Sequence, residues 1–284
     1  ARPPMTTAPS REYVLGTGTD ELQRLALQHR LWADAAHAAW RFSRIAIGQR
    51  VLDVGSGPGF ASFDLAQLVT SAGRVVGVDE SSAFISSLNT QAKARDLPQL
   101  RGLVGDVHEL PALLSASAES ELFDLAYARW VLCFVKDPAA VIAGIAASLR
   151  PGGRCVVHDY FNYRAMTTAP RRASHDRVVA ATVQSWEARG GDTDICGRLP
   201  ALFEQFGMEV ERIEAHQRVA RGGDTMFQWV HVWWHTYTPK LVGMGLITQA
   251  QCDELLADLA TIKQDHTQFV TLPTVYEIIA IKCG

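Results

Sequence analysis

The stretch "RVLDVGSGPGF", residues 50–60, decides the fold of this chain. Its apolar run ends at Val54, and three glycines follow closely, at Gly55, Gly57 and Gly59. Glycine is entropically costly in an ordered segment, so such a cluster indicates positive φ angles or a close approach to the backbone. The stretch therefore predicts a strand, a glycine-rich turn and a helix, with backbone N–H groups facing a ligand.

Short β-type runs alternate with segments of helical period beyond this turn. The predicted strands lie at 50–54, 74–79, 101–104, 123–128 and 154–158, and the predicted helices at 59–70, 82–95 and 137–149. Such alternation is typical of βαβ units whose parallel sheet is covered on both faces. The expected fold class is α/β, with a doubly wound, mostly parallel sheet.

The remaining segments surround this core. Residues 20–44 have helical period with Asp20 as the expected N-cap, which predicts a helical N-terminal arm over residues 1–44. One further domain, 45–284, is expected to carry helical insertions at about 160–206 and 224–269, and late strands near 208–215 and 274–282.

The composition narrows the class of partner. The 284 residues carry a net charge of −3, which offers no basic footprint for nucleic acid. No apolar run approaches the length of a membrane span. The five cysteines are scattered without a CxxC pair, so we expect reduced thiols in a cytoplasmic protein.

The residues around the glycines distinguish between two kinds of ligand. A dinucleotide fingerprint needs a small residue at its third position, where this chain has Phe60. Asp53, inside the strand, would repel a pyrophosphate but suits the ammonium group of an amino acid. Asp79 ends the next predicted strand and Asp106 follows the third, and they could accept hydrogen bonds from ribose hydroxyls and an adenine amino group. Their alternative roles are a helix N-cap and a turn residue.

Five successive segments resemble the motifs of class I S-adenosylmethionine-dependent methyltransferases of the small-molecule type. They are "VLDVGSGPG", "VVGVDES", "VGDVHELP", "FDLAYARWVL" and "LRPGGR", within about residues 45–160. The late strands are similar to the antiparallel pair that closes this family's seven-stranded sheet. The segment 12–32 is similar to the family's helical arm, which covers the cofactor.

The resemblance implies S-adenosylmethionine as the cofactor and a set of residues that would bind it. Asp53, Gly55 and Gly57 would hold the methionine end, Asp79 the ribose, and Asp106 with Val107 the adenine. Glu80 is included in the cofactor-binding set, and Tyr13, Gln28 and Arg129 would close over the cofactor.

The acceptor is expected to lie between the insertions. The segment "HDYFNY" (158–163) leaves the fifth strand at the cofactor edge, and "TMFQWVHVWWHTY" (225–237) is rich in aromatic residues. The second segment is either buried core or the wall of an aromatic pocket. We expect His158, Tyr160 and His231 as catalytic residues, with His235 weighed equally with His231. Asp159 alone does not make a metal site, so no metal is expected.

The predicted function is methyl transfer to a small, apolar or aromatic metabolite, such as a secondary metabolite. Two alternatives stay open: a methyltransferase of RNA or protein, and a non-catalytic S-adenosylmethionine-binding module. A homodimer is also left open.

Overall fold

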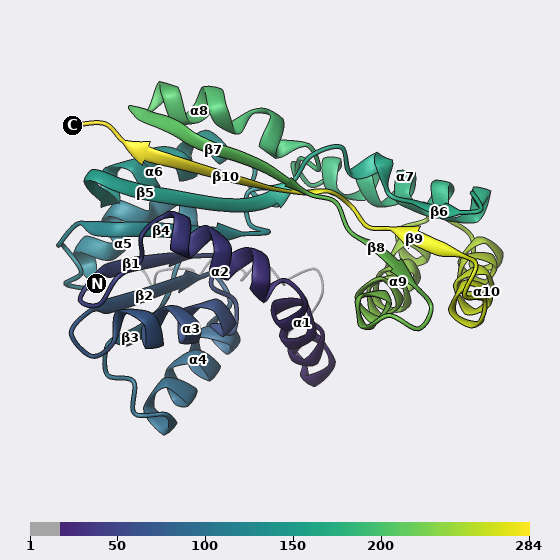
Figure 1. Cartoon of the computed structure of the whole chain (residues 1–284), viewed down its shortest axis with the longest axis horizontal. Coiled ribbons are helices and arrows are strands. Elements are labelled where there is room, and N and C mark those ends of the chain that lie inside the picture. Colours follow the sequence, from purple (N-terminus) through teal and green to yellow (C-terminus); the bar gives the residue numbers. More distant parts are fainter. Residues whose placement is uncertain (1–17) are drawn as a thin grey trace, which may run out of the picture.

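The computed structural model describes residues 18–284, and a seven-stranded sheet forms their centre (Figure 1). The strand order is β3-β2-β1-β4-β5-β10-β7. The strands are β1 (Arg50–Val54), β2 (Arg74–Asp79), β3 (Leu100–Val104), β4 (Phe123–Arg129), β5 (Leu149–Tyr160), β7 (Met208–His216) and β10 (Val275–Lys282). The first five in sequence pair in parallel, and β10 lies antiparallel to β5 and β7. The predicted fold class is confirmed.

Helices cover both faces of this sheet, as its continuous apolar strands require. One face packs against α3 (Phe60–Val69), α4 (Ser82–Ala94) and α2 (Ala33–Phe42), through side chains such as Phe63, Leu88 and Trp40. The other face packs against α5 (Leu110–Ala116), α6 (Pro138–Ser148) and α8 (Leu199–Gln205). The carboxyl ends of the parallel strands remain open to a ligand.

A second, three-stranded sheet lies beside the core and was missed by the sequence analysis. Its order is β6-β9-β8, from β6 (Thr167–Ala169), β8 (Val219–Arg221) and β9 (Phe269–Thr271). Together with α7 (Ala173–Glu187), α9 (Thr225–Gly243) and α10 (Gln249–Gln264) it forms what we call the cap (Figure 1). The expected insertions at 160–206 and 224–269 are thus not purely helical. Strands of three residues give too short a pattern to detect.

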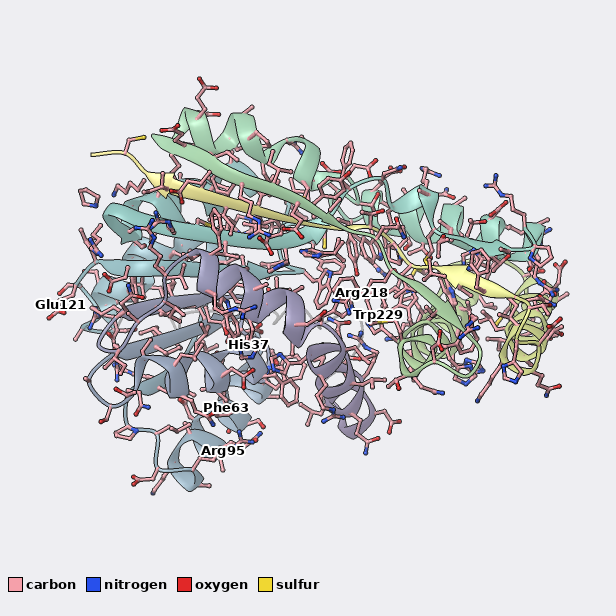
Figure 2. The ribbon with its side chains drawn as sticks, in the orientation of Figure 1. His37, Phe63, Arg95, Glu121, Arg218 and Trp229 are labelled. Carbon is pink, nitrogen blue, oxygen red and sulfur yellow. The ribbon has the colours of Figure 1, made fainter. Side chains whose placement is uncertain are left out.

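The described part of the predicted helical N-terminal arm forms two helices. α1 (Thr19–Leu31) and α2 are separated at Trp32, whose φ of −112° leaves the helical region. Gly18 occupies the N-cap of α1, so the prediction of Asp20 there was wrong; Asp20 lies in the first turn, where its charge favours the helix dipole. Arg218, just after β7, holds this segment by donating to Leu31 O at 2.7 Å and to the Asp34 carboxylate (Figure 2).

No helix within residues 18–284 combines the length and the apolar character needed to cross a membrane.

Candidate active site

The turn after β1 presents bare backbone to the site. Gly55, Gly57 and Gly59 have φ angles of +67°, +54° and +89°, a region that side chains strongly disfavour. A Cβ on Gly55 would lie 2.3 Å from Val131, and one on Gly59 would lie 2.7 Å from Leu88. A Cβ on Gly57 would meet nothing within 4 Å, because this residue lines an open cavity. The glycines therefore serve both close packing and access to the backbone.

Two carboxylates flank this turn at the ends of neighbouring strands. Asp53 in β1 is buried and accepts a hydrogen bond from Ser62 Oγ at 2.5 Å. Burial raises its pKa to about 6, so a bound ammonium group would stabilise its ionised form. Asp79 at the end of β2 accepts from Gly57 N and Ser81 N, each at 2.9 Å. Burial raises the pKa of Asp79, and those two hydrogen bonds oppose the increase.

A third carboxylate follows β3 at the same edge of the sheet. Asp106 caps a short 3₁₀ turn and accepts from His108 N at 2.9 Å. Val107 and Glu80 line the same cavity. We call residues 53–59 with Asp79 and Asp106 the cradle.

One cavity of about 570 Å³ connects the cradle to the cap. This volume lies within the usual range for small-ligand sites. All the expected cofactor-binding residues among the described part of the chain line it: Gln28, Asp53, Gly55, Gly57, Asp79, Glu80, Asp106, Val107 and Arg129. Tyr13 lies outside the described residues.

Helix α1 closes one side of the cavity. Gln28 Oε1 accepts from Trp229 Nε1 of α9 at 2.9 Å and from Arg24 Nη1 at 3.0 Å. Arg129 at the end of β4 lies with its Nη2 2.9 Å from His29 Nδ1, also on α1. These contacts join the arm, the core and the cap around one space.

Aromatic side chains line the half of the cavity beneath the cap. We call them the acceptor wall: Trp130, Tyr160, Tyr163, Trp186, Trp229, Trp233 and Tyr237. The Tyr237 hydroxyl accepts from Trp186 Nε1 at 3.0 Å and lies 2.8 Å from Ser185 Oγ, which fixes part of the wall. The segment 225–237 thus supplies both pocket wall and buried core. Trp229, Trp233 and Tyr237 line the cavity, whereas Trp234 is fully buried and does not line it.

Trp130 was missed by the sequence analysis. It follows β4 with a φ of +54°, which is a genuine outlier for a bulky residue. Its indole lies 6.0 Å from that of Trp229 and 6.4 Å from the Tyr160 ring, within the acceptor wall. Its buried Nε1 has no hydrogen-bond partner among the described residues. Backbone strain and an unpaired donor at one residue are typical of ligand-binding positions.

The structure separates the three expected catalytic residues. Only Tyr160 lines the cavity. Burial raises its pKa well above the ordinary value, so it can donate a hydrogen bond but does not ionise near neutral pH. His231 is not among the lining residues and neither is His235; their rings lie 4.0 Å apart on α9, and the His231 ring stacks near Phe227.

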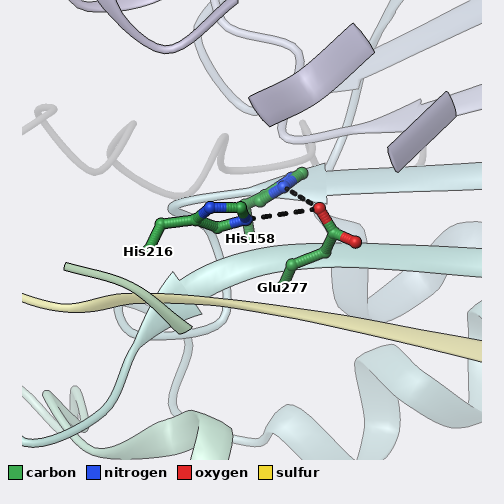
Figure 3. Close-up of side chains that lie close together, drawn as sticks. All are labelled: His158, His216 and Glu277. Atoms are coloured by element: carbon green, nitrogen blue, oxygen red, sulfur yellow. Dashed lines mark hydrogen bonds and ion pairs between the residues drawn. The ribbon is translucent and has the colours of Figure 1, made fainter. Parts of the chain in front are cut away.

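His158 is buried behind the cavity and is held by Glu277 of β10 (Figure 3). Its Nε2 lies 3.2 Å from Glu277 Oε2, and His216 Nε2 lies 3.4 Å from the same oxygen. His158 does not line the cavity, because its ring packs toward Glu277 and Tyr127. Its catalytic role stays a prediction that this contact does not support.

The ligand atoms of His158, His216 and Glu277 lie within 4.8 Å of one another, so this group was tested as a metal site. Metal-binding histidines normally donate their second ring N–H to a partner, but His158 Nδ1 is buried without one. The guanidinium of Arg212 also lies 3.3 Å from Glu277 Oε1. A hydrogen-bonded carboxylate between two imidazoles fits these contacts better than a cation does.

Comparisons with known proteins agree with this geometry. A family model described as "Methyltransferase domain" matches residues 46–213. The arsenite methyltransferase of Halobacterium salinarum is 30% identical over 42% of this chain and 29% of its own length. The 2-phytyl-1,4-naphtoquinone methyltransferase of Synechococcus elongatus is 32% identical over 46% of this chain and 53% of its own length. The matched region thus spans between about a third and a half of these relatives.

Among solved structures, the YcgJ protein of Bacillus subtilis superimposes with a TM-score of 0.58. It shares 13% sequence identity, and the alignment covers 88% of this chain and 99% of that one. At this identity the likeness shows the fold alone.

Proposed function

The chain belongs to the methyltransferase domain family, as a class I S-adenosylmethionine-dependent methyltransferase, and from this premise we propose that it methylates a small acceptor with an apolar or aromatic body. The observation that carries the proposal is the single cavity in which the cradle meets the acceptor wall. The naphthoquinone acceptor in the name of the Synechococcus relative is of this chemical kind. The name of the Halobacterium relative gives a different acceptor, arsenite, so acceptors differ among these relatives. The proposed acceptor class therefore rests on the aromatic side chains of the acceptor wall.

The cradle residues fit the cofactor's chemistry. The exposed backbone of Gly57 offers close approach, Asp53 suits an ammonium, and Asp79 retains acceptor capacity on both oxygens for a diol. S-adenosylmethionine supplies an activated methyl group on a sulfonium. Asp106 and Val107, which line the same cavity, are proposed to hold the adenine.

The protein's part in the reaction is then positioning and exclusion of water. In-line displacement needs the acceptor atom aligned at near-contact distance from the methyl carbon. The acceptor wall would orient a flat body, and its ring faces would attract the cationic methyl group. The hydrogen bond between Gln28 and Trp229 would hold α1 against α9 and so help to exclude water from the cavity during the reaction.

Tyr160 is proposed to orient the acceptor by donating its hydroxyl hydrogen. Trp130 Nε1, in the acceptor wall beside Tyr160, is a second donor. Neither His158 nor His231 reaches the cavity in this structure, so the proposal assigns no general base to them. An acceptor that is already a good nucleophile needs none.

The two alternatives predict different behaviour. An RNA or protein methyltransferase would modify a macromolecule, and a non-catalytic module would bind the cofactor without turnover.

The described cysteines carry free thiols, four of them buried, which supports a reducing, cytoplasmic location as part of the proposal.

The experiment has two arms. Calorimetry should show S-adenosylhomocysteine binding that falls at least about tenfold in Asp79→Ala, because charge-assisted hydrogen bonds to the ribose are lost. The control Asp253→Ala removes an exposed carboxylate of α10 and should bind normally. Mass spectrometry of metabolite extracts should then reveal a product heavier by one methyl group. Preferential binding of NAD, or methylation of RNA or protein alone, would overturn the proposal.

A further inference from the structure

The charged residues that line the cavity are divided between its two ends. The lining carboxylates all lie at or beside the cradle: Asp53, Asp79, Glu80 and Asp106. The cavity also meets four arginine or lysine side chains. Arg129 at the end of β4 acts on Asp53 and so lies beside the cradle. The other three are Arg24 of α1, Lys136 of the loop between β4 and α6, and Arg189 just after α7. No lining carboxylate lies at the cap end among residues 18–284.

Lys136 and Arg189 form the edge of the acceptor end. Gly190 has a φ of +84° and approaches Lys136 so closely that an added Cβ would lie 3.1 Å from Lys136 Cγ. The loop that carries Lys136 therefore packs against the turn that carries Arg189. Both are exposed, as befits charged groups at the mouth of a pocket.

The carboxylates nearest to them in sequence are engaged elsewhere. Asp137 caps α6 by accepting from Ala140 N at 3.0 Å, and Glu187 lies 3.9 Å from Arg164. Within the described chain, neither Lys136 nor Arg189 has a carboxylate within 4.0 Å, and the hydrogen bond recorded for Arg189 is to Met244 Sδ at 3.6 Å. Their charges are not balanced by the protein.

Two further cationic side chains lie near the cap end of the cavity, Arg24 of α1 and Lys240 of α9. Arg24 is buried and pairs with Glu21 at 2.6 Å, so it contributes little net charge. Burial lowers the pKa of Lys240 on α9, and the nearby guanidinium groups of Arg24 and Arg189 lower it further, although Glu21 opposes them. The cap end thus gathers more positive than negative charge around an apolar pocket.

We infer that the acceptor carries an anionic group, such as a carboxylate, which Lys136 and Arg189 bind at the cavity mouth while its apolar body lies against the acceptor wall. This inference rests on the proposed function and narrows it to amphiphilic, negatively charged acceptors. Opposite charge at a pocket mouth also raises the rate of encounter, and salt weakens that effect.

The inference can be tested without knowing the acceptor, using two fluorescent probes of similar shape. They are the anion 8-anilinonaphthalene-1-sulfonate and the neutral N-phenyl-1-naphthylamine, titrated into the full chain saturated with S-adenosylhomocysteine. We expect the anion to bind more tightly, and its affinity to fall about tenfold in the Lys136→Ala/Arg189→Ala double variant, at a few-fold for each exposed charge. The neutral probe should change less than about twofold, since its binding does not depend on ion pairs.

The matched control is Lys93→Ala, which removes an exposed cation of α4 that does not line the cavity. It should leave both probes unaffected. Equal affinity for the two probes, an unchanged anion affinity in the double variant, or no binding of the anion overturns the inference. Failure of S-adenosylhomocysteine to bind overturns the proposed function instead, so the two failures are distinguishable.

Discussion

His158 Nε2 and Glu277 Oε2 lie 3.2 Å apart across the antiparallel β5–β10 pair, and both side chains are buried. Burial lowers the pKa of His158, which keeps the imidazole neutral. Burial alone would raise the pKa of Glu277, but hydrogen bonds from His158 and His216 bring it down to about 2. The pair is therefore a neutral donor bound to a carboxylate, and it stabilises the sheet behind the cavity.

This arrangement predicts that the protein needs no divalent metal. Excess chelator should leave both the melting temperature and the turnover unchanged, because two imidazoles and the Arg212 guanidinium already surround the Glu277 carboxylate. Elemental analysis of the purified protein should find no stoichiometric zinc. Zinc at one atom per chain that disappears in His216→Ala would show that the cluster is a metal site.

His175 predicts a specific loss of stability in acid. It is fully buried on α7, its ring lies 5.6 Å from that of Trp234, and burial lowers its pKa to about 4. The unfolded chain binds this proton near pH 6.5, so the full stability is present above about pH 6.5. As the pH falls to about 4, roughly 3 kcal/mol should be lost. Urea unfolding across this range measures the loss.

The variant His175→Phe should flatten that part of the pH profile, because phenylalanine cannot titrate. His266→Phe, on an exposed turn, is the matched control and should keep the wild-type slope. If His175→Phe retained the full slope, another group would have to carry the proton linkage.

Gly57 can be tested against a glycine of similar backbone and different surroundings. Gly57 and Gly152 have φ angles of +54° and +76°, and a Cβ on either would meet nothing within 4 Å. Alanine at each should cost about 1–2 kcal/mol of folding free energy through strain. Only Gly57→Ala should also weaken S-adenosylhomocysteine binding, by at least about tenfold. Equal affinities in the two variants would show that the cavity does not bring the ligand to Gly57.

Tyr160 and His231 give opposite predictions although both were expected to be catalytic. Tyr160→Phe removes a donor inside the cavity and should reduce turnover about tenfold once an acceptor is found, with S-adenosylhomocysteine affinity unchanged. His231→Ala alters a side chain that does not line the cavity and should keep wild-type turnover. The reverse result would place the acceptor beside α9's outer face.

The cradle could be predicted from sequence because its residues follow local rules. Asp53 lies one residue before the end of β1, Asp79 ends β2 and Asp106 follows β3, and parallel strands bring their carboxyl ends to one edge. His158 also lies near the end of a strand, yet its partner depends on the register between β5 and β10, a contact of 119 residues' separation. No periodic pattern encodes that register. The sequence did not predict Trp130 as a site residue for a related reason. Its positive φ angle and its contact with Trp229 mark it as part of the site, and both are known only from the structure.

The cap has a further consequence through the way the chain enters and leaves it. β7 continues into β8, and β9 leads into β10, so that two strands of the core sheet run on into the cap sheet (Figure 1). The chain crosses from core to cap before β6, returns to form α8 and β7, and crosses again for β8 to β9. The cap is therefore interlaced with the core and is not a detachable module. Exchanging acceptor specificity between relatives would require two separate grafts, each spliced into a strand that the core cannot lose.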